Sequence, residues 1–235
     1  MTLARKRVAV LISGRGSNMS ALIDAAADPD FPAEIVGVIS DKPDALGLGI
    51  AASRGLATKS LPRKDYSSKE AHDGAIDAAL VAMKADLVVL AGYMRLLTAH
   101  FVEKWHGRMI NIHPALLPSF KGLDTHRRAL EAGVRIHGCT VHFVTAEMDD
   151  GPIIAQAAVP VLSDDTEATL TARVLKAEHR IYPLALRLVA EGKAKMEGGR
   201  TVYSAFHENE AKAILVSPDP LRDVVDLEGL ARITP

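Results

Sequence analysis

Residues 8–18 read VAVLISGRGSN, an apolar run that passes directly into small and polar residues. A short apolar run rich in valine and isoleucine is typical of a strand that is buried on both faces of a sheet. The glycines that follow predict a tight turn, and the pattern of residues 18–27 predicts a helix. This stretch therefore predicts a strand, a glycine-rich turn and a helix, the unit from which parallel α/β sheets are built.

The same alternation continues through the first half of the chain. Short apolar runs predict strands, and the amphipathic stretches between them predict helices. Ser67 and Glu70 have the spacing of a capping box, so we expect them to open the helix at that point. The further strands are expected at 34–39, 86–91 and 109–113, and the further helices at 44–53, 67–84 and 98–105.

The pattern changes after His113. Two prolines and a glycine break residues 114–122 into a loop, and two strand-like runs then follow each other without a helix, which predicts an antiparallel extension of the sheet. A long helix, kinked at Pro183, and a hairpin complete the pattern. The strands are expected at 138–144 and 153–161, the helix at 165–190 with an apolar stripe of Leu170, Val174, Ala177, Ile181 and Leu184, and the hairpin at 195–203.

These elements together predict an α/β fold. We expect a Rossmann-like, mostly parallel sheet with an antiparallel extension and helices on both faces. No internal repeat or low-complexity linker divides the sequence. We therefore expect a single domain over residues 1–203, followed by a C-terminal extension of unknown role at 204–235.

Composition argues against several classes of protein. The 235 residues hold 28 Lys and Arg against 29 Asp and Glu, so no global basic field favours nucleic acid. No run approaches the ~18 apolar residues of a membrane helix, and the first apolar run is too short for a signal peptide. Cys139 is the single cysteine, which favours a reducing compartment. We expect a cytoplasmic protein with small-molecule partners, no nucleic acid and no membrane, and homodimerisation is left open.

The turn at residues 14–18 has the features of an anion site. Free backbone N–H groups at a helix N-terminus attract a phosphate, and glycine lets it approach the backbone. Met19 occupies the place of the third glycine of a dinucleotide fingerprint, and no Gly-Lys-Ser/Thr follows, so a monophosphate fits better than a pyrophosphate. The structural alternative is a tight strand-to-helix turn that binds nothing.

Asn111 and His113 lie two residues apart at the end of a predicted strand, so their side chains point to the same face. Asp149, on the turn between the two later strands, can orient the imidazole and favour its protonated form. An amide and an imidazolium together can stabilise an oxyanion. No Ser or Cys adjoins His113 in the sequence, so we expect the attacking group to belong to the substrate. The structural alternatives are a capped strand end and an Asx turn.

Several motifs, in order between about residues 7 and 203, resemble the folate-dependent formyltransferase family. Residues 111–118 (NIHPALLP) followed by Gly122 resemble the first half of its signature, and residues 137–143 (HGCTVHF) followed by Asp149-x-Gly151-Pro152 resemble the second half. Residues 14–18 are similar to the phosphate loop of members that act on glycinamide ribonucleotide (GAR). Residues 92–97 (GYMRLL) resemble the family's folate-pocket segment.

The resemblance implies transfer of a formyl group from 10-formyltetrahydrofolate, as co-substrate, to the amine of GAR in de novo purine (IMP) biosynthesis, with no metal. It implies catalytic roles for Asn111, His113 and Asp149. The implied GAR-binding residues are Gly16, Ser17 and Asn18 at the phosphate and Glu178 at the ribose hydroxyls. The implied folate-binding residues are Lys69, Met94, Arg95, Leu96, Leu97 and Asn111.

Three of these positions have competing interpretations. Lys69 stands where the family has an Arg, so it keeps the charge but loses the bidentate fork, and a solvated helix residue is the alternative. Asp150 places a second carboxylate beside Asp149, although the register with Gly151-Pro152 favours Asp149 as the inward residue. Glu178 lies at the edge of an apolar stripe, where an unpaired carboxylate is costly, or else at the surface.

Other functions remain as alternatives. A different folate-dependent formyltransferase or a deformylase shares the central motifs, although tRNA-modifying members carry a further basic domain and deformylases an N-terminal regulatory one. A nucleotide-binding oxidoreductase accounts for the first loop but leaves Asn111, His113 and Asp149 unexplained. A metal enzyme is not expected, because His137 and His142 are five residues apart on one strand and no HExxH motif or Cys pair is present.

Overall fold

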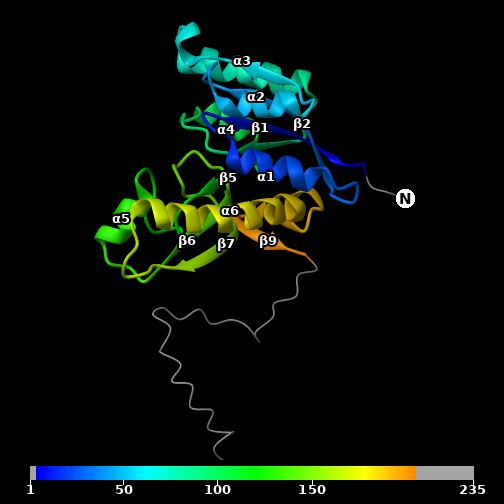
Figure 1. Cartoon of the computed structure of the whole chain (residues 1–235). Coiled ribbons are helices and arrows are strands. Elements are labelled where there is room, and N and C mark those ends of the chain that lie inside the picture. Colours follow the sequence, from blue (N-terminus) through cyan, green and yellow to red (C-terminus); the bar gives the residue numbers. More distant parts are fainter. Residues whose placement is uncertain (1–3, 205–235) are drawn as a thin grey trace, which may run out of the picture.

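The computed structural model describes residues 4–204, so the expected C-terminal extension lies outside the described residues except for Ser204. A seven-stranded sheet in the order β3-β2-β1-β4-β5-β6-β7 forms its centre, and β8 and β9 form a separate hairpin (Figure 1). The strands are β1 (Lys6–Ile12), β2 (Ala33–Ser40), β3 (Thr58–Ser60), β4 (Leu87–Leu90), β5 (Met109–His113), β6 (Ile136–Phe143), β7 (Ile153–Pro160), β8 (Ala194–Glu197) and β9 (Arg200–Tyr203).

Helices cover both faces of this sheet. Side chains of β1 alternate between two core clusters: Val8 and Val10 join one with α1, α2 and α6, and Ala9 and Leu11 join the other with α3 and α4. The helices are α1 (Ser17–Ala26), α2 (Leu46–Ser53), the short 3-10 helix η1 (Arg63–Asp65), α3 (Lys69–Ala82), α4 (Ala99–Lys104), α5 (Thr125–Glu131) and α6 (Glu167–Ala190).

Strand direction changes after β5. The strands from β3 to β5 pair in parallel, whereas β6 is antiparallel to both β5 and β7. The predicted fold class is therefore confirmed. The chain also reverses its direction of travel across the sheet at β1, since β2 and β3 lie on one side of it and β4 and β5 on the other. Ligands bind at such a switch point, at the carboxyl ends of the strands.

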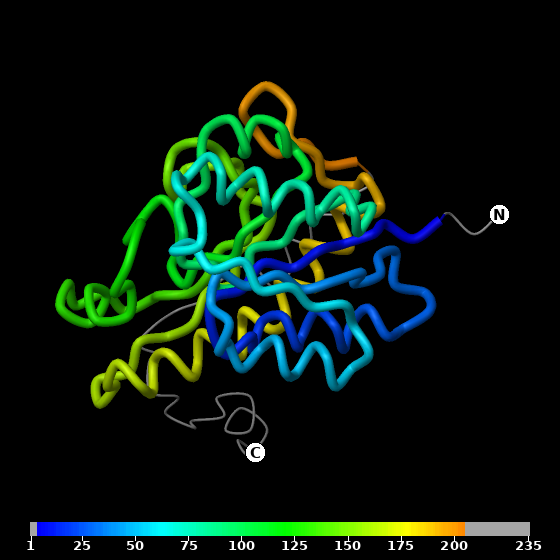
Figure 2. Tube along the Cα trace, turned by 90° about the horizontal axis from the view of Figure 1, so that it is seen from above, coloured from blue at the N-terminus to red at the C-terminus, as the bar shows by residue number. Residues whose placement is uncertain are grey.

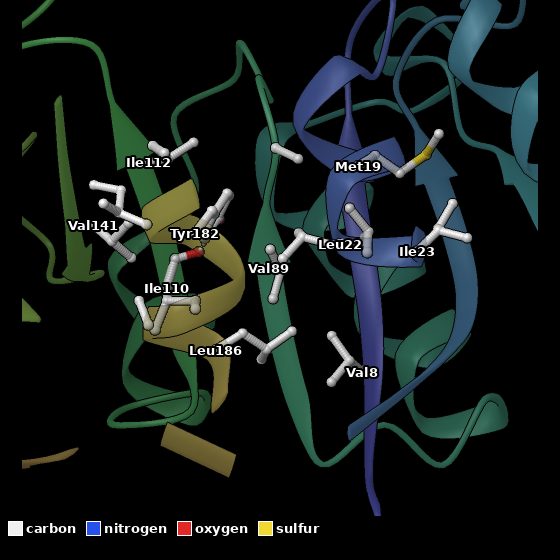
Figure 3. Packing of buried hydrophobic residues seen from close by; sticks show 14 of the residues in the cluster. Val8, Met19, Leu22, Ile23, Val89, Ile110, Ile112, Val141, Tyr182 and Leu186 are labelled. Carbon is white, nitrogen blue, oxygen red and sulfur yellow. Dashed lines mark hydrogen bonds between the residues drawn. The ribbon is translucent and has the colours of Figure 1, made fainter. Parts of the chain in front are cut away.

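Tyr182 of α6 anchors this helix to the middle of the sheet. Its fully buried hydroxyl donates to the carbonyl oxygen of Leu90 at 2.8 Å and lies 3.3 Å from that of Ile110, so α6 is tied to both β4 and β5 (Figure 3). A buried tyrosine combines a large apolar surface with one hydrogen bond. The strand that carries Asn111 and His113 is therefore held in place by its contact with α6.

Two details of the predicted helices are wrong. Ser68, and not Ser67, caps α3, and its hydroxyl accepts from the Ala71 N–H at 3.1 Å. Leu184 does not continue the apolar stripe of α6, because its side chain is 50% exposed while Tyr182 is buried. Two residues along a helix correspond to a rotation of about 200°, which turns Leu184 to the opposite face from Tyr182.

The sequence did not predict β3 or α5. β3 is three residues long, and α5 has the sequence THRRALE, in which only Thr125 and Ala129 are buried, so neither presents a clear apolar period. Figure 2 shows the green segment with α5 at one edge of the molecule, near the start of α6. The hairpin expected at 195–203 is present as β8 and β9.

Candidate active site

Asn111 and His113 at the end of β5 face the turn that joins β6 to β7. His113 is 4% exposed, and its Nδ1 lies 3.3 Å from Oδ2 of Asp149. The same carboxylate oxygen accepts the backbone N–H of Gly122 at 2.9 Å, which fixes its position. The sequence-predicted histidine and aspartate are therefore in contact although they are far apart along the chain.

Both ring nitrogens of His113 face oxygen acceptors. Nε2 lies 2.9 Å from the carbonyl oxygen of Phe120, while Nδ1 faces Asp149. A carbonyl oxygen only accepts hydrogen bonds, so Nε2 carries a hydrogen, and a bare Nδ1 would then point its lone pair at a carboxylate. The surroundings therefore suit a ring that carries a hydrogen on each nitrogen, and the Nε2–H is the one that can be donated to an oxyanion.

His142 lies between Asn111 and the same carboxylate, and sequence analysis gave it no role. It lies opposite Asn111 in the β5–β6 pairing, with Nε2 3.2 Å from Asn111 Nδ2 and 3.8 Å from Asp149 Oδ1. Its Nδ1 donates to the Phe143 carbonyl at 2.8 Å, and burial lowers the pKa of His142. The neutral ring thus accepts from the Asn111 amide. The antiparallel register was the signal that could have found it.

Asp149 and Asp150 point in different directions. Asp149 has φ 52°, a left-handed conformation, and its side chain is 12% exposed beside His113. The Asp150 side chain is 53% exposed and forms an ion pair with Lys121. The choice of Asp149 as the inward residue is therefore supported by its position in the structure.

The loop at residues 14–18 folds tightly against the start of α2. Gly16 adopts φ 75° just before α1 begins at Ser17, and a Cβ there would lie 3.1 Å from the Cα of Gly47. Only glycine fits such a position without strain. The first N–H groups of α1 have no partners within the helix, and Arg15, just before them, lines a groove of about 540 Å³ together with the first turns of α6.

Asn18 and Glu178 form a partly buried pair that joins α1 to α6. Asn18 Nδ2 donates to Glu178 Oε2 at 2.6 Å, and Glu178 is only 7% exposed. Burial raises the pKa of Glu178, while the hydrogen bond from Asn18 acts in the opposite direction. The amide oxygen of Asn18 is buried and has no hydrogen-bond partner among residues 4–204. The interpretation of Glu178 as a surface residue is therefore wrong.

Residues 92–97 follow β4 and lie next to the loop at 14–18. Met94 and Leu96 are 64% and 66% exposed, so two large apolar side chains lie close together at the surface of this segment. Lys69 lies beside this segment, but its ammonium group donates to the Leu97 carbonyl at 3.2 Å. Arg95 pairs with Asp41. The predicted folate residues thus gather at one edge of the site.

No group of three or more His, Cys, Asp or Glu side chains in the described part of the chain could hold a metal ion. Within the same residues, none of the helices is both long and apolar enough to cross a membrane.

Known proteins resemble this chain over most of its length. A phosphoribosylglycinamide formyltransferase from Escherichia coli is 46% identical over 204 residues, which cover 87% of this chain and 92% of that protein. The crystal structure of a phosphoribosylglycinamide formyltransferase from Brucella melitensis matches with a TM-score of 0.77 and 61% identity, over 79% of this chain and 96% of that one.

A longer relative shares the same region. The trifunctional purine biosynthetic protein adenosine-3 of Bos taurus is 52% identical over 85% of this chain, yet the match spans only 20% of that protein. The family model described as formyl transferase matches residues 6–186. The resemblance seen in the sequence motifs is thereby confirmed. The chain belongs to the formyl transferase family, and it is an enzyme that transfers formyl groups.

Proposed function

We propose that this enzyme transfers the formyl group of 10-formyltetrahydrofolate to the amine of GAR, a step of de novo purine biosynthesis. The observation that carries the proposal is the contact between His113 and Asp149, next to an Asn111 amide that donates to His142. In the sheet order, the loop suited to a phosphate follows β1, the segment with exposed apolar side chains follows β4, and this set lies at the end of the next strand, β5. A site of this kind suits one phosphorylated and one flat apolar substrate.

The reaction needs no nucleophile from the protein. The neutral amine of GAR attacks the formyl carbon, and the carbonyl oxygen becomes an oxyanion that Asn111 Nδ2 and His113 Nε2 stabilise. The new C–N bond forms, the bond to N10 of the folate breaks, and the proton lost by the amine is returned to N10. Asp149 orients His113 through Nδ1. In the structure, the Nε2–H of His113 donates to the carbonyl oxygen of Phe120. In the reaction, the oxyanion replaces this carbonyl as the acceptor of that hydrogen bond.

GAR binds, in this proposal, across the start of α1. The phosphate oxygens accept hydrogen bonds from the backbone N–H groups of Gly16, Ser17 and Asn18, at the positive end of the helix dipole. The ribose hydroxyls donate to Glu178, and the unpartnered amide oxygen of Asn18 offers a further acceptor. A buried acceptor without a partner is costly, and a hydroxyl from the substrate relieves that cost.

The folate lies, in this proposal, against residues 92–97. Met94 and Leu96 cover its ring system, and their exposed surface is removed from water when the folate binds. Arg95, Leu97, Lys69 and Asn111 complete the predicted contacts. Residues 1–203 constitute the catalytic domain, and the enzyme acts on small molecules in the cytoplasm. Sedimentation velocity of the full chain tests whether it forms the homodimer left open by the sequence.

A coupled product assay tests the proposal. Purified full-length chain is incubated with 10-formyltetrahydrofolate and GAR, and tetrahydrofolate and formylated GAR are both quantified. We expect the two products in a 1:1 ratio and no tetrahydrofolate when GAR is left out. Tetrahydrofolate release without GAR would indicate a deformylase. A change in nicotinamide absorbance with neither folate product would instead favour an oxidoreductase.

A further inference from the structure

Ser13 connects the two loops that are proposed to hold different substrates. It precedes the loop at 14–18, and its N–H donates to the Gly92 carbonyl at 3.1 Å. Its hydroxyl accepts the Met94 N–H at 2.8 Å and donates to Asp41 Oδ1 at 2.5 Å. One 5%-exposed serine therefore makes three hydrogen bonds that join the ends of β1, β2 and β4.

Asp41 extends this connection to Arg95. It directly follows β2, and its side chain is 1% exposed. One carboxylate oxygen accepts the Ser13 hydroxyl and the other accepts Arg95 Nε at 2.9 Å. A buried carboxylate is stable only when both oxygens have partners. Asp41 therefore links the backbone and a side chain of the folate segment to the loop that begins at Ser13.

The other end of the folate segment is held in a similar way. Lys69 donates to the Leu97 carbonyl at 3.2 Å, and the buried Asp73 accepts the Thr98 N–H at 2.6 Å. Between these two anchors, Met94 and Leu96 extend into solvent. The backbone is thus fixed at both ends while the apolar side chains are presented outward. Binding to a segment that is already ordered avoids the entropy cost of ordering it.

We propose that Ser13 and Asp41 are positioning residues for the formyl donor. They hold residues 92–97 in the conformation that binds folate and keep that segment in fixed register with the GAR loop. This inference rests on the proposed function for the identity of the ligand. The structural part, that Ser13 and Asp41 order residues 92–97, holds or fails independently of the ligand.

The test combines hydrogen exchange with binding. Ser13→Ala, Asp41→Ala and Asp41→Asn are compared with wild type in the full chain, by exchange mass spectrometry of peptides covering residues 92–98 and by calorimetric titration with tetrahydrofolate and, separately, GAR. Asp86→Ala is the matched control. The Asp86 side chain also joins β1 and β4, because it accepts the Arg7 N–H at 2.8 Å, but it lies at the amino ends of these strands, away from the site.

We expect faster exchange in residues 92–98 and a roughly tenfold weaker Kd for tetrahydrofolate in Ser13→Ala and Asp41→Ala, with the GAR Kd changed less than about threefold. Asp41→Asn keeps one acceptor oxygen and should lie between wild type and Asp41→Ala. A variant that combines Ser13→Ala with Asp41→Ala should lose less tetrahydrofolate binding free energy than the sum of the two single losses, because both residues belong to one hydrogen-bonded connection. Asp86→Ala should leave both readouts unchanged.

Three results would overturn the inference: unchanged exchange at residues 92–98, faster exchange with unaltered tetrahydrofolate affinity, or equal losses for tetrahydrofolate and GAR. A wild-type chain that binds no tetrahydrofolate would instead contradict the proposed function. In that case the exchange data alone decide whether Ser13 and Asp41 order the segment.

Discussion

The two sides of the candidate site differ in how their polar and apolar groups are satisfied. On the antiparallel side, at the end of β5, His113 is buried, Asp149 is partly buried, and both have partners within the protein. On the parallel side, at the ends of β1 and β4, the Asn18 amide oxygen lacks a partner among the described residues, and Met94 and Leu96 are exposed. One side is complete without ligand, and the other is not.

This difference separates chemistry from binding. Groups that stabilise a transition state act best when the protein already fixes their orientation, because no reorganisation is then needed during the reaction. Groups that recognise substrate must keep open hydrogen-bonding capacity and apolar surface until the substrate arrives. Substitutions on the antiparallel side should therefore change kcat, and substitutions on the parallel side should change KM.

Asp149→Asn should give the largest effect. The amide can present an N–H to Nδ1 of His113, which disfavours a ring with hydrogens on both nitrogens. We expect kcat to fall roughly 100- to 1,000-fold, as for loss of an oxyanion donor. Steady-state kinetics with both substrates checks this, with Asp150→Asn as the matched control because Asp150 pairs with Lys121 at the surface. Equal losses in both variants would contradict the assignment.

His142→Ala should have a smaller effect on the same side. It removes the acceptor that orients the Asn111 amide but leaves the contact between His113 and Asp149. We expect kcat to fall about tenfold, close to the value of one hydrogen bond, with little change in either KM. His100→Ala, an exposed histidine of α4, is the control. An unchanged kcat in His142→Ala would show that Asn111 needs no such support.

Glu178→Gln should change the parallel side instead. We expect the KM for GAR to rise roughly tenfold through weaker hydrogen bonds to the ribose, with kcat nearly unchanged. A fall in kcat with unchanged KM would remove the distinction between the two sides.

The same variant should be more stable at neutral pH. Because burial raises the pKa of Glu178 above its ordinary 4.5, its contribution to stability is fully present below that pH and is lost as the pH rises through the folded pKa. A glutamine side chain does not ionise, so the Tm of the variant should exceed that of wild type by an amount that grows as the pH rises above about 4.5 and becomes constant above the folded pKa. Calorimetric scans across these pH values provide the measurement, and a difference that shows no such growth would contradict the cause given for the shift.

Tyr182→Phe should give the smallest effect, and on stability alone. The ring stays buried while the hydrogen bond to Leu90 is lost, so we expect a loss of about 1 kcal/mol and a Tm lower by about 2–4 °C. Tyr182 contacts β4 and β5 through their backbone and has no proposed contact with substrate. We therefore expect kcat and both KM values to remain at wild-type level. A large loss of activity would mean that α6 controls the geometry of one side.

The fold and the pairing of Asn111 with His113 could be predicted because their signals are local, whereas the GAR- and folate-binding residues followed from the resemblance to the formyltransferase family. Buried parallel strands are short apolar runs, and Asn111 and His113 share a face through the period of a strand. His142 could not be found in that way, since its role depends on which residue it faces across an antiparallel pair. Ser13 and Asp41 carried a weaker signal, a single polar residue directly after a buried strand, which sequence analysis did not use.

Single-turnover kinetics gives the most direct test of the separation between chemistry and binding. His113→Ala and Glu178→Gln, each in excess over 10-formyltetrahydrofolate, are mixed with varied GAR, so that the rate at saturation and the GAR concentration for half-saturation are obtained from one experiment. We expect His113→Ala to lose at least about 100-fold in the saturated rate with half-saturation near that of wild type, and Glu178→Gln to keep the saturated rate but to need more GAR for half-saturation. A saturated rate in His113→Ala equal to that of wild type would contradict it.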